Sequence, residues 1–158
     1  RMGLHPVGRL DMNTSGLLLF SSDGQLTQRL LNPRNGVERE YVAEVDGDAL
    51  MPELSQKLAA GVETSDGSFP ARLVDQKEGE VRLIVTEGKY RMVRRILNNI
   101  GLPVTKLHRV RYGEVKLRAV LPESMHTNDL STDNAIALAV GEWTADLPPQ
   151  VLNWANGR

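Results

Sequence analysis

Apolar and polar positions near the start of the chain predict a strand followed by a helix. The run Gly-Leu-Leu-Leu-Phe lies within residues 15–22 between polar residues, which is typical of a short buried strand. Ser22 is followed three residues later by Gln25, which is the spacing of a capping box. We therefore expect a helix to begin there, with its apolar positions at Leu26, Leu30 and Leu31.

Strict alternation over residues 38–46 predicts a second strand. Tyr41, Ala43 and Val45 fall on one face, and the acidic residues between them fall on the other. Because the first face is apolar, Tyr41 is expected to point toward the core side of the sheet.

The middle of the chain predicts one more helix and two more strands. Residues 52–60 have a proline near the start and Gly61 beyond the end, as helices commonly do. Strands are predicted at 69–75 and 81–86, with a turn at Glu78-Gly79 between them.

Residues 87–103 contain the clearest helical pattern. Its apolar stripe consists of Val93, Ile96, Leu97 and Ile100. Gly101 and Pro103 end it. The residues predicted for the opposite side are Arg91, Arg94, Arg95 and Asn98. We expect this helix to present three guanidinium groups, with free backbone N–H groups at its start.

The order of these elements predicts the fold class. Residues 105–117 have the pattern of a basic strand, bent or bulged at Gly113, and residues 151–155 that of a short helix. Strands and helices mix without regular β-α-β alternation, so we expect an α+β fold with a mixed, mainly antiparallel sheet flanked by helices.

Composition limits the classes of protein to consider. The chain has 158 residues, of which 41% are hydrophobic and 25% charged, as expected for one globular domain. The absence of cysteine excludes disulfides and thiolate metal sites. No apolar run approaches the roughly 18 residues of a membrane span, and no signal-peptide pattern opens the chain. We therefore expect a soluble intracellular protein.

The net charge of −1 conceals a strong asymmetry. Residues 89–118 hold nine of the 19 basic residues and a single acid, Glu114, whereas the 40 residues after them hold five acids and one arginine. Segregated positive charge is typical of a surface that faces a polyanion, although a solvated basic face would give the same pattern.

Several catalytic patterns are absent. Gly88-Lys89 lacks the spacing of a phosphate-binding loop, because position 83 is leucine. The three histidines lack metal-ligand spacing. No Gly-x-Ser-x-Gly turn occurs, and Ser15 has no evident histidine partner. Acyl transfer and metal-dependent hydrolysis are therefore not favoured.

Asp11 is a lone carboxylate in the stretch GRLDMNTSGLLLF, and two interpretations of it are open. It can cap the turn that follows, as aspartate often does. Alternatively, it is a catalytic acid that pairs with Arg94 in a site shielded from water. Tyr41 is equally open, because a strand tyrosine can belong to the core or form the floor on which a nucleobase stacks.

The stretch from Gly8 to Leu17 resembles the signature of the pseudouridine synthases, in the branch that modifies ribosomal RNA and is named for the small-subunit enzyme. That signature is Gly-Arg-Leu-Asp, two variable residues and Thr-Ser-Gly-Leu, and every fixed position is present. EREYVAEVDG resembles the strand with the active-site tyrosine, here Tyr41. EGKYRMVRRILNNIGLP and the basic strand after it resemble the third motif, whose basic residue is here Arg94.

The resemblance covers about residues 3–118 and has two departures. Many members have His-Gln or Asn-Gln where this chain has Arg91-Met92. Members usually begin with further strands, often behind a small RNA-binding domain. We therefore expect residues 1–158 to be a catalytic domain without those N-terminal strands and without an upstream RNA-binding domain.

The resemblance implies an isomerase that converts a uridine of ribosomal RNA to pseudouridine without a cofactor or metal. Asp11 would be the essential carboxylate, Tyr41 would stack on the uracil, and Arg94 would pair with Asp11. The target uridine must be flipped out of the RNA to be reached. The candidates for phosphate contacts, chosen for charge and position, are Arg9, Lys89, Arg91, Arg95, Arg109 and Arg111. We expect a monomer in the cytoplasm, or in an organelle with its own ribosomes.

Two other functions remain as alternatives. A non-catalytic RNA-binding module would use the basic helix at 89–98 and the strand at 105–117, with Asp11 only as a cap. A glycoside-type hydrolase would need a second carboxylate roughly 5–10 Å from the first. The nearest candidates in sequence, Asp23 and Glu38, have the patterns of turn and surface residues.

Overall fold

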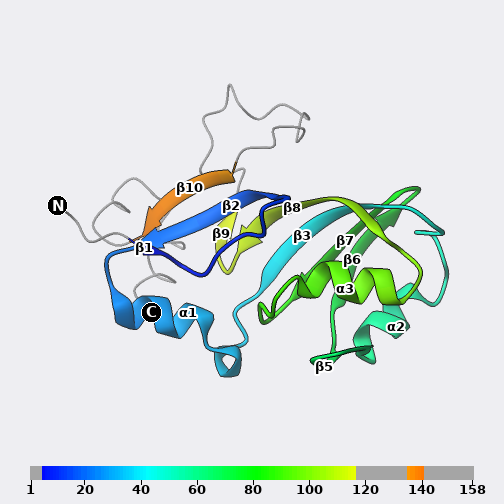
Figure 1. The fold of residues 1–158 in the computed structure, drawn as a ribbon, viewed down its shortest axis with the longest axis horizontal. Coiled ribbons are helices and arrows are strands. Elements are labelled where there is room, and N and C mark those ends of the chain that lie inside the picture. The colour runs from blue at the N-terminus through cyan, green and yellow to red at the C-terminus, as the bar shows by residue number, and fades with distance from the viewer. Residues whose placement is uncertain (1–4, 117–134, 141–158) are drawn as a thin grey trace.

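The computed structural model describes residues 5–116 and the backbone of residues 135–140 (Figure 1). Eight strands in this part form one sheet, in which β1, β2, β8, β3, β7 and β6 are neighbours in that order, β9 pairs with β8, and β10 pairs with β2. Their bounds are β1 His5–Pro6, β2 Thr14–Ser21, β3 Arg39–Val45, β6 Arg72–Lys77, β7 Glu80–Val85, β8 Val104–Tyr112, β9 Val115–Lys116 and β10 Ala135–Val140. β4 (Val62–Thr64) and β5 (Gly67–Phe69) form a separate two-stranded ribbon.

The sheet is mixed but mainly antiparallel. β2 pairs in parallel with β8 and with β10, and the other pairings are antiparallel. This confirms the predicted α+β class. The parallel pairing of β2 with β8 places the turn before β2 beside the middle of the basic strand.

Three α-helices cover the described sheet. They are α1 (Gly24–Leu31), α2 (Leu54–Ala59) and α3 (Met92–Asn99), and a 3-10 turn, η1 (Pro33–Asn35), follows α1. In Figure 1, α1 lies at the β1–β2 end of the sheet, while α2 and α3 lie together at the other end. α2 and α3 pack with β3, β7 and β8 in a core that includes Leu54, Leu83, Ile96 and Leu97. No helix in the described residues is long and apolar enough to span a membrane.

The first helix begins one residue later than the capping-box spacing predicted. Its N-cap is Asp23, whose side chain accepts hydrogen bonds from the backbone N–H groups of Gln25 and Leu26. Aspartate is at least as good an N-cap as serine, and at this position it places Gln25 too early in the helix for a capping box. Leu26 and Leu30 are buried as predicted, but Leu31 is exposed.

The strand predictions hold with shifted ends. β3 buries Ala43 and Val45, and Tyr41 packs against the same core. The strand predicted at 69–75 is divided at Pro70, because residues 67–69 belong to the ribbon and β6 begins at Arg72. A proline lacks the N–H donor of a ladder, so a break there is expected.

One side of α3 agrees with the sequence pattern, and the other does not. Val93, Ile96 and Leu97 are buried as predicted. Arg94 is also buried, so the helix does not present three guanidinium groups on one exposed side. Arg94 and Arg91 reach back to the turn before β2, whereas Arg95 reaches the turn of the β4–β5 ribbon.

The second half of the chain differs most from expectation. Gly113 is not a bulge within one strand: it opens the tight turn between β8 and β9, where Tyr112 pairs with Val115. β10 was not predicted from the pattern. The helix predicted at 151–155 lies outside the described residues.

Gly16 allows β2 and β8 to approach closely. Its φ is +107°, and a Cβ atom placed there would lie 2.2 Å from the carbonyl oxygen of Arg109. Both the dihedral angle and the lack of space exclude a side chain at this position. The glycine of the Thr-Ser-Gly signature is therefore required for the strand pairing that fixes the turn before it.

We predict that Gly16→Ala lowers the free energy of unfolding by about 2 kcal/mol or more, because alanine must adopt an unfavourable φ and displace backbone. Gly24→Ala is the matched control, since a Cβ atom at Gly24 meets nothing within 4 Å. It should change stability by no more than about 0.5 kcal/mol. Urea unfolding of both variants measures the difference, and equal stabilities would contradict the role given to Gly16.

Candidate active site

A cleft of about 600 Å³ lies on the α3 side of the sheet. It is lined by residues from the β1–β2 connection, β3, the segment before α3, and β8. Asp11, Tyr41, Lys89 and Arg109 are among them, so residues distant in the sequence meet here. Of the residues predicted for the site, Arg9 and Arg91 also line it, whereas Arg94, Arg95 and Arg111 do not.

Asp11 lies in a tight turn that α3 holds in place. The backbone N–H of Thr14 donates to the Asp11 carbonyl at 2.9 Å and closes the turn. Arg94 Nη2 donates to the backbone carbonyl of Asn13 at 2.6 Å, and Arg91 Nη1 donates to Asn13 Oδ1 at 3.0 Å. Arg94 of α3 thus holds the backbone of Asn13, and Arg91, the N-cap of α3, holds its side chain, two residues beyond the half-buried Asp11.

Arg94 does not form the predicted ion pair with Asp11 in the part of the chain that the structure describes. Its hydrogen bonds go to Asn13 and, at 3.4 Å, to Thr14 Oγ1. Burial lowers the pKa of Arg94 and the nearby charge of Arg91 lowers it further, while Asp11 acts in the opposite direction. Asp11 therefore interacts with Arg94 through space, and the direct contact is with the backbone of the turn.

Tyr41 forms part of the cleft from β3. It is half-buried, packs against the core below, and lies opposite Arg109 of β8. The ladder between β3 and β8 shifts register between Glu40 and Tyr41. Such an irregularity changes the local twist of a strand and the direction of its side chains. The two sequence interpretations of Tyr41 are therefore compatible, since it contacts the core and lines the cleft.

The predicted RNA contacts fall into two groups. Arg9 and Lys89 are exposed and line the cleft, and Arg91 lines it half-buried. Arg91 is also the one non-glycine residue in the described chain with positive φ, at 49°. Backbone strain of this kind concentrates at functional sites.

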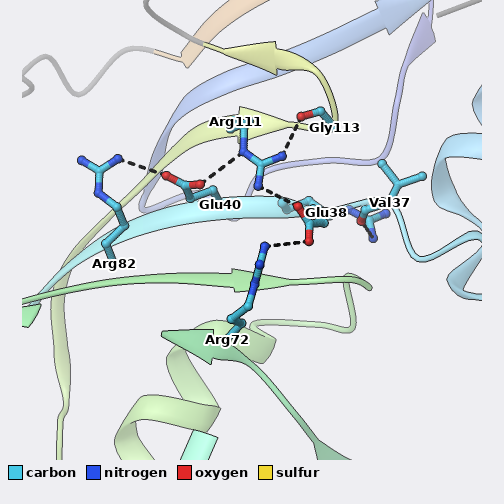
Figure 2. Close-up of polar contacts among 8 residues, drawn as sticks. Val37, Glu38, Glu40, Arg72, Arg82, Arg111 and Gly113 are labelled. Carbon is cyan, nitrogen blue, oxygen red and sulfur yellow. Dashed lines mark hydrogen bonds and ion pairs between the residues drawn. The ribbon is translucent and has the colours of Figure 1, made fainter. Parts of the chain in front are cut away.

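Arg95 and Arg111 instead have partners within the protein. Arg95 pairs with Asp66 of the β4–β5 turn at 2.7 Å. Arg111 pairs with Glu38 at 3.0 Å and with Glu40 at 3.2 Å, and donates to the Gly113 carbonyl (Figure 2). Arg111 cannot bind a phosphate without losing these contacts. Arg95 is held by Asp66 through Nη1, and its Nε and Nη2 are buried without a hydrogen-bond partner in the described residues.

Figure 2 shows that the Arg111 contacts belong to a larger network of ion pairs. Its members lie on or next to the neighbouring strands β8, β3, β7 and β6. Glu38 also accepts from Arg72 at 2.8 Å, and Glu40 accepts from Arg82 at 3.1 Å. Burial lowers the pKa of Arg111, but its bonds to Glu38 and Glu40 outweigh burial and raise the pKa above its usual value. Glu38 is one of the two sequence candidates for a second catalytic carboxylate, and it is part of this ion-pair network.

Arg109 is buried, with an exposed fraction of 4%. Its Nε donates to the Leu17 carbonyl at 2.8 Å. A side chain this deeply buried is poorly placed for the phosphate contact that was predicted for Arg109 from its charge. Arg109 lines the cleft from below, so its partner has to enter the cleft.

Two residues at the cleft floor were missed by sequence reasoning. Arg39 and Tyr112 are both buried and both line the cleft. Arg39 precedes Tyr41 by two residues, so the alternation that placed Tyr41 on the core side of the strand placed Arg39 there as well. A cation on the apolar face of a strand could therefore have identified Arg39 as a candidate residue of the cleft.

Ser15 has a histidine partner, contrary to expectation. Ser15 Oγ lies 2.6 Å from His108 Nδ1, joining β2 to β8. His108 is buried, and its Nε2 has no hydrogen-bond partner in residues 5–116. Without an orienting acid in the described residues, the pair lacks the third member of a catalytic triad. Nor do the described residues contain a group of three or more possible metal ligands.

Burial lowers the pKa of His108, and the charge of Lys106 lowers it further. The unfolded chain therefore binds a proton more readily than the folded protein as the pH falls below about 6.5. We predict that stability decreases between pH 7.5 and pH 5.5, and that His108→Gln reduces this decrease. Lys106→Gln is the control, and it should retain most of the decrease because burial is the larger cause. Urea unfolding at the two pH values checks this, and an unchanged decrease in His108→Gln would contradict it.

Comparisons with known proteins agree with the resemblance. The sequence matches the model of the RNA pseudouridylate synthase family over residues 2–132. Ribosomal large subunit pseudouridine synthase B of Yersinia pestis is 42% identical over 134 residues, which is 81% of this chain and 42% of that protein. The Escherichia coli K12 protein of the same name is 40% identical over 153 residues, which is 91% of this chain and 50% of that protein.

A solved structure supports the same assignment. A crystal structure of pseudouridylate synthase has a TM-score of 0.68 and 33% sequence identity, and the match covers 72% of this chain and 50% of that chain. The chain thus spans about half the length of the curated relatives that it matches. Since the family match includes the Asp11 turn, β3, α3 and β8, this chain belongs to the RNA pseudouridylate synthase family.

Proposed function

We propose that residues 1–158 hold the catalytic domain of an enzyme that isomerises a uridine of ribosomal RNA to pseudouridine. The main support is the position of Asp11, a half-buried carboxylate in a fixed turn at the cleft that Tyr41 and exposed cations also line. The printed names of the relatives favour RNA of the large ribosomal subunit as the substrate.

The reaction needs no net oxidation and no second substrate. The bond between N1 of uracil and C1′ of ribose breaks, and a bond between C5 and C1′ forms. C5 loses its proton and N1 gains one. Asp11 acts either as the nucleophile at the sugar or as the base that removes a sugar proton. A single carboxylate suffices for either role, which accounts for the lone acid in the signature.

Tyr41 is proposed to hold the detached uracil by stacking. Its ring is anchored by the core below and lines the cleft above, so it provides a rigid surface. A uridine within a stacked RNA helix cannot reach this position, and the nucleotide therefore has to be flipped into the cleft.

Arg94 is proposed to act as a positioning residue. Its contact with the Asn13 carbonyl holds the turn that carries Asp11, and its charge lies near enough to interact with that carboxylate. This replaces the direct ion pair as its role. Precise placement of a reacting group is a large part of catalytic power.

The proposed phosphate contacts are Arg9, Lys89 and Arg91. These three cations line the cleft, and Arg9 and Lys89 are exposed. Because the described residues assemble the cleft within one chain, we expect the protein to act as a monomer. We expect it to act in the compartment that holds its ribosomes.

We predict that Asp11→Asn lowers tritium release from RNA labelled at uridine C5 by at least about 100-fold, because the reacting carboxylate is lost. RNA binding should remain within about threefold of wild type, since the amide preserves shape and phosphate contacts. The substrate is an unmodified transcript of large-subunit ribosomal RNA. Equal release from wild type and Asp11→Asn would exclude a catalytic Asp11. Binding without release from either protein would favour the RNA-binding module.

We also predict that Lys89→Gln reduces the salt dependence of RNA binding, because it removes one phosphate contact. The slope of log affinity against log salt concentration should decrease by about 0.7–0.9. Lys77→Gln is the control, as Lys77 is exposed on β6 outside the cleft and pairs with Glu80. Filter binding at several salt concentrations measures both slopes, and equal changes would exclude a specific role for Lys89.

A further inference from the structure

Two buried arginines contact the same tyrosine ring at the floor of the cleft. The guanidinium carbons of Arg39 and Arg109 lie 4.9 Å and 5.0 Å from the centre of the Tyr112 ring. Each arginine has an exposed fraction of 4%, and all three residues line the cleft. Buried guanidinium groups are costly unless their hydrogen bonds are satisfied, so the partners of each decide its role.

Arg39 has its partners within the protein. Its Nη1 donates to the Val37 carbonyl at 3.1 Å, and its Nη2 donates to the Leu30 carbonyl and to Tyr112 Oη at 3.2 Å and 2.9 Å. The Tyr112 hydroxyl in turn donates to the Leu30 carbonyl. Arg39 thus joins β3 to the end of α1 and to β8, which is a structural role.

The guanidinium group of Arg109 has a hydrogen-bond partner at one nitrogen and none at another. Its Nε donates to the Leu17 carbonyl, but its Nη2 is buried without a hydrogen-bond partner in the described part of the chain. No carboxylate pairs with Arg109 among these residues either. Leaving a buried charged donor unpaired costs more than a typical hydrogen bond contributes, which suggests that its acceptor arrives with a ligand.

The position of Arg109 indicates which part of the RNA it would meet. Arg109 is the cross-strand partner of Tyr41, and both line the cleft. The Cβ atoms of directly opposite residues on neighbouring strands lie about 5 Å apart, so a planar group resting on Tyr41 lies beside the strand position of Arg109. Arg9 and Lys89 also line the cleft but are exposed, which suits contacts with phosphates.

We propose that Arg109 contacts the target base, with its guanidinium donating a hydrogen bond to a carbonyl oxygen of uracil. The inference rests on the proposed function and adds a contact to it. Uracil has two carbonyl acceptors, O2 and O4, and a guanidinium has only donors. The pair is therefore matched, and the bond forms only when the base has entered the cleft.

The first test separates a functional Arg109 from a structural one. Arg109→Met keeps the length of the side chain and removes the unpaired charge, and it loses one hydrogen bond, to the Leu17 carbonyl, so its melting temperature should stay close to that of wild type. Pseudouridine formation under single-turnover conditions should decrease by about 10- to 100-fold, as for the loss of a hydrogen bond from a charged donor. Arg39→Met is the matched control, and it should lower the melting temperature because it leaves carbonyl groups unsatisfied. Wild-type activity in Arg109→Met would overturn the proposal.

The second test identifies the contact through the substrate. Transcripts of large-subunit ribosomal RNA are prepared with uridine, 2-thiouridine or 4-thiouridine, and the isomerised nucleoside is measured after digestion by chromatography and mass spectrometry. Sulfur is a weaker acceptor than oxygen, so one thio-transcript should slow the wild-type protein by about 10-fold. The same replacement should have no further effect on Arg109→Met, since the contact is already lost.

The outcomes distinguish the two proposals. If neither thio-replacement affects wild type more than Arg109→Met, Arg109 does not touch the base, although the isomerase function stands. If the wild-type protein forms no pseudouridine on the uridine transcript, the proposed function fails, and the Arg109 inference that rests on it fails as well.

Discussion

The hydrogen bond from Arg94 to the backbone carbonyl of Asn13 is the contact on which the site depends. It joins α3 to the turn before β2, and α3 is in turn fixed by Val93, Ile96 and Leu97 in the core. The position of Asp11 is therefore set by the packing of a helix rather than by a partner of its own carboxylate. A backbone acceptor has the advantage that it leaves both oxygens of Asp11 available for chemistry.

The periodicity of apolar residues predicted helices and strands well wherever burial of one apolar face determined them. Ala43 and Val45 are buried because a strand alternates, and Ile96 and Leu97 because a helical stripe packs on a sheet. The pattern was less accurate at the ends of elements and at turns, where neighbouring residues compete for the same role. Asp23 rather than Ser22 is the N-cap of α1, and Gly113 begins a hairpin turn instead of a bulge. The pairing of β10 with β2 joins segments more than 110 residues apart, and no local pattern contains that information.

The arginines show what sequence reasoning can and cannot predict about a site. The motif order predicted that Asp11, Tyr41 and Arg94 lie in one region of the fold. Positive charge alone, however, could not predict which arginines pair with acids and which line the cleft. In the fold, Arg111 is neutralised by Glu38 and Glu40, Arg95 by Asp66, and Arg109 is buried beneath the cleft. These differences arise from neighbours elsewhere in the fold, and they divide the basic segment into arginines paired with acids, arginines that contact the Asp11 turn, and a buried arginine that lines the cleft.

The long sequence separation of the contacts around the Asp11 turn has a consequence for synthesis. Arg94 lies 81 residues after Asn13, and His108 lies 93 residues after its partner Ser15. Non-local contacts of this kind close late, because the intervening chain must first be made and ordered. A nascent chain therefore carries Asp11 in an unformed turn until α3 and β8 have been synthesised. The cleft around Asp11 is assembled only once β8 has left the exit tunnel, because residues of both segments line it.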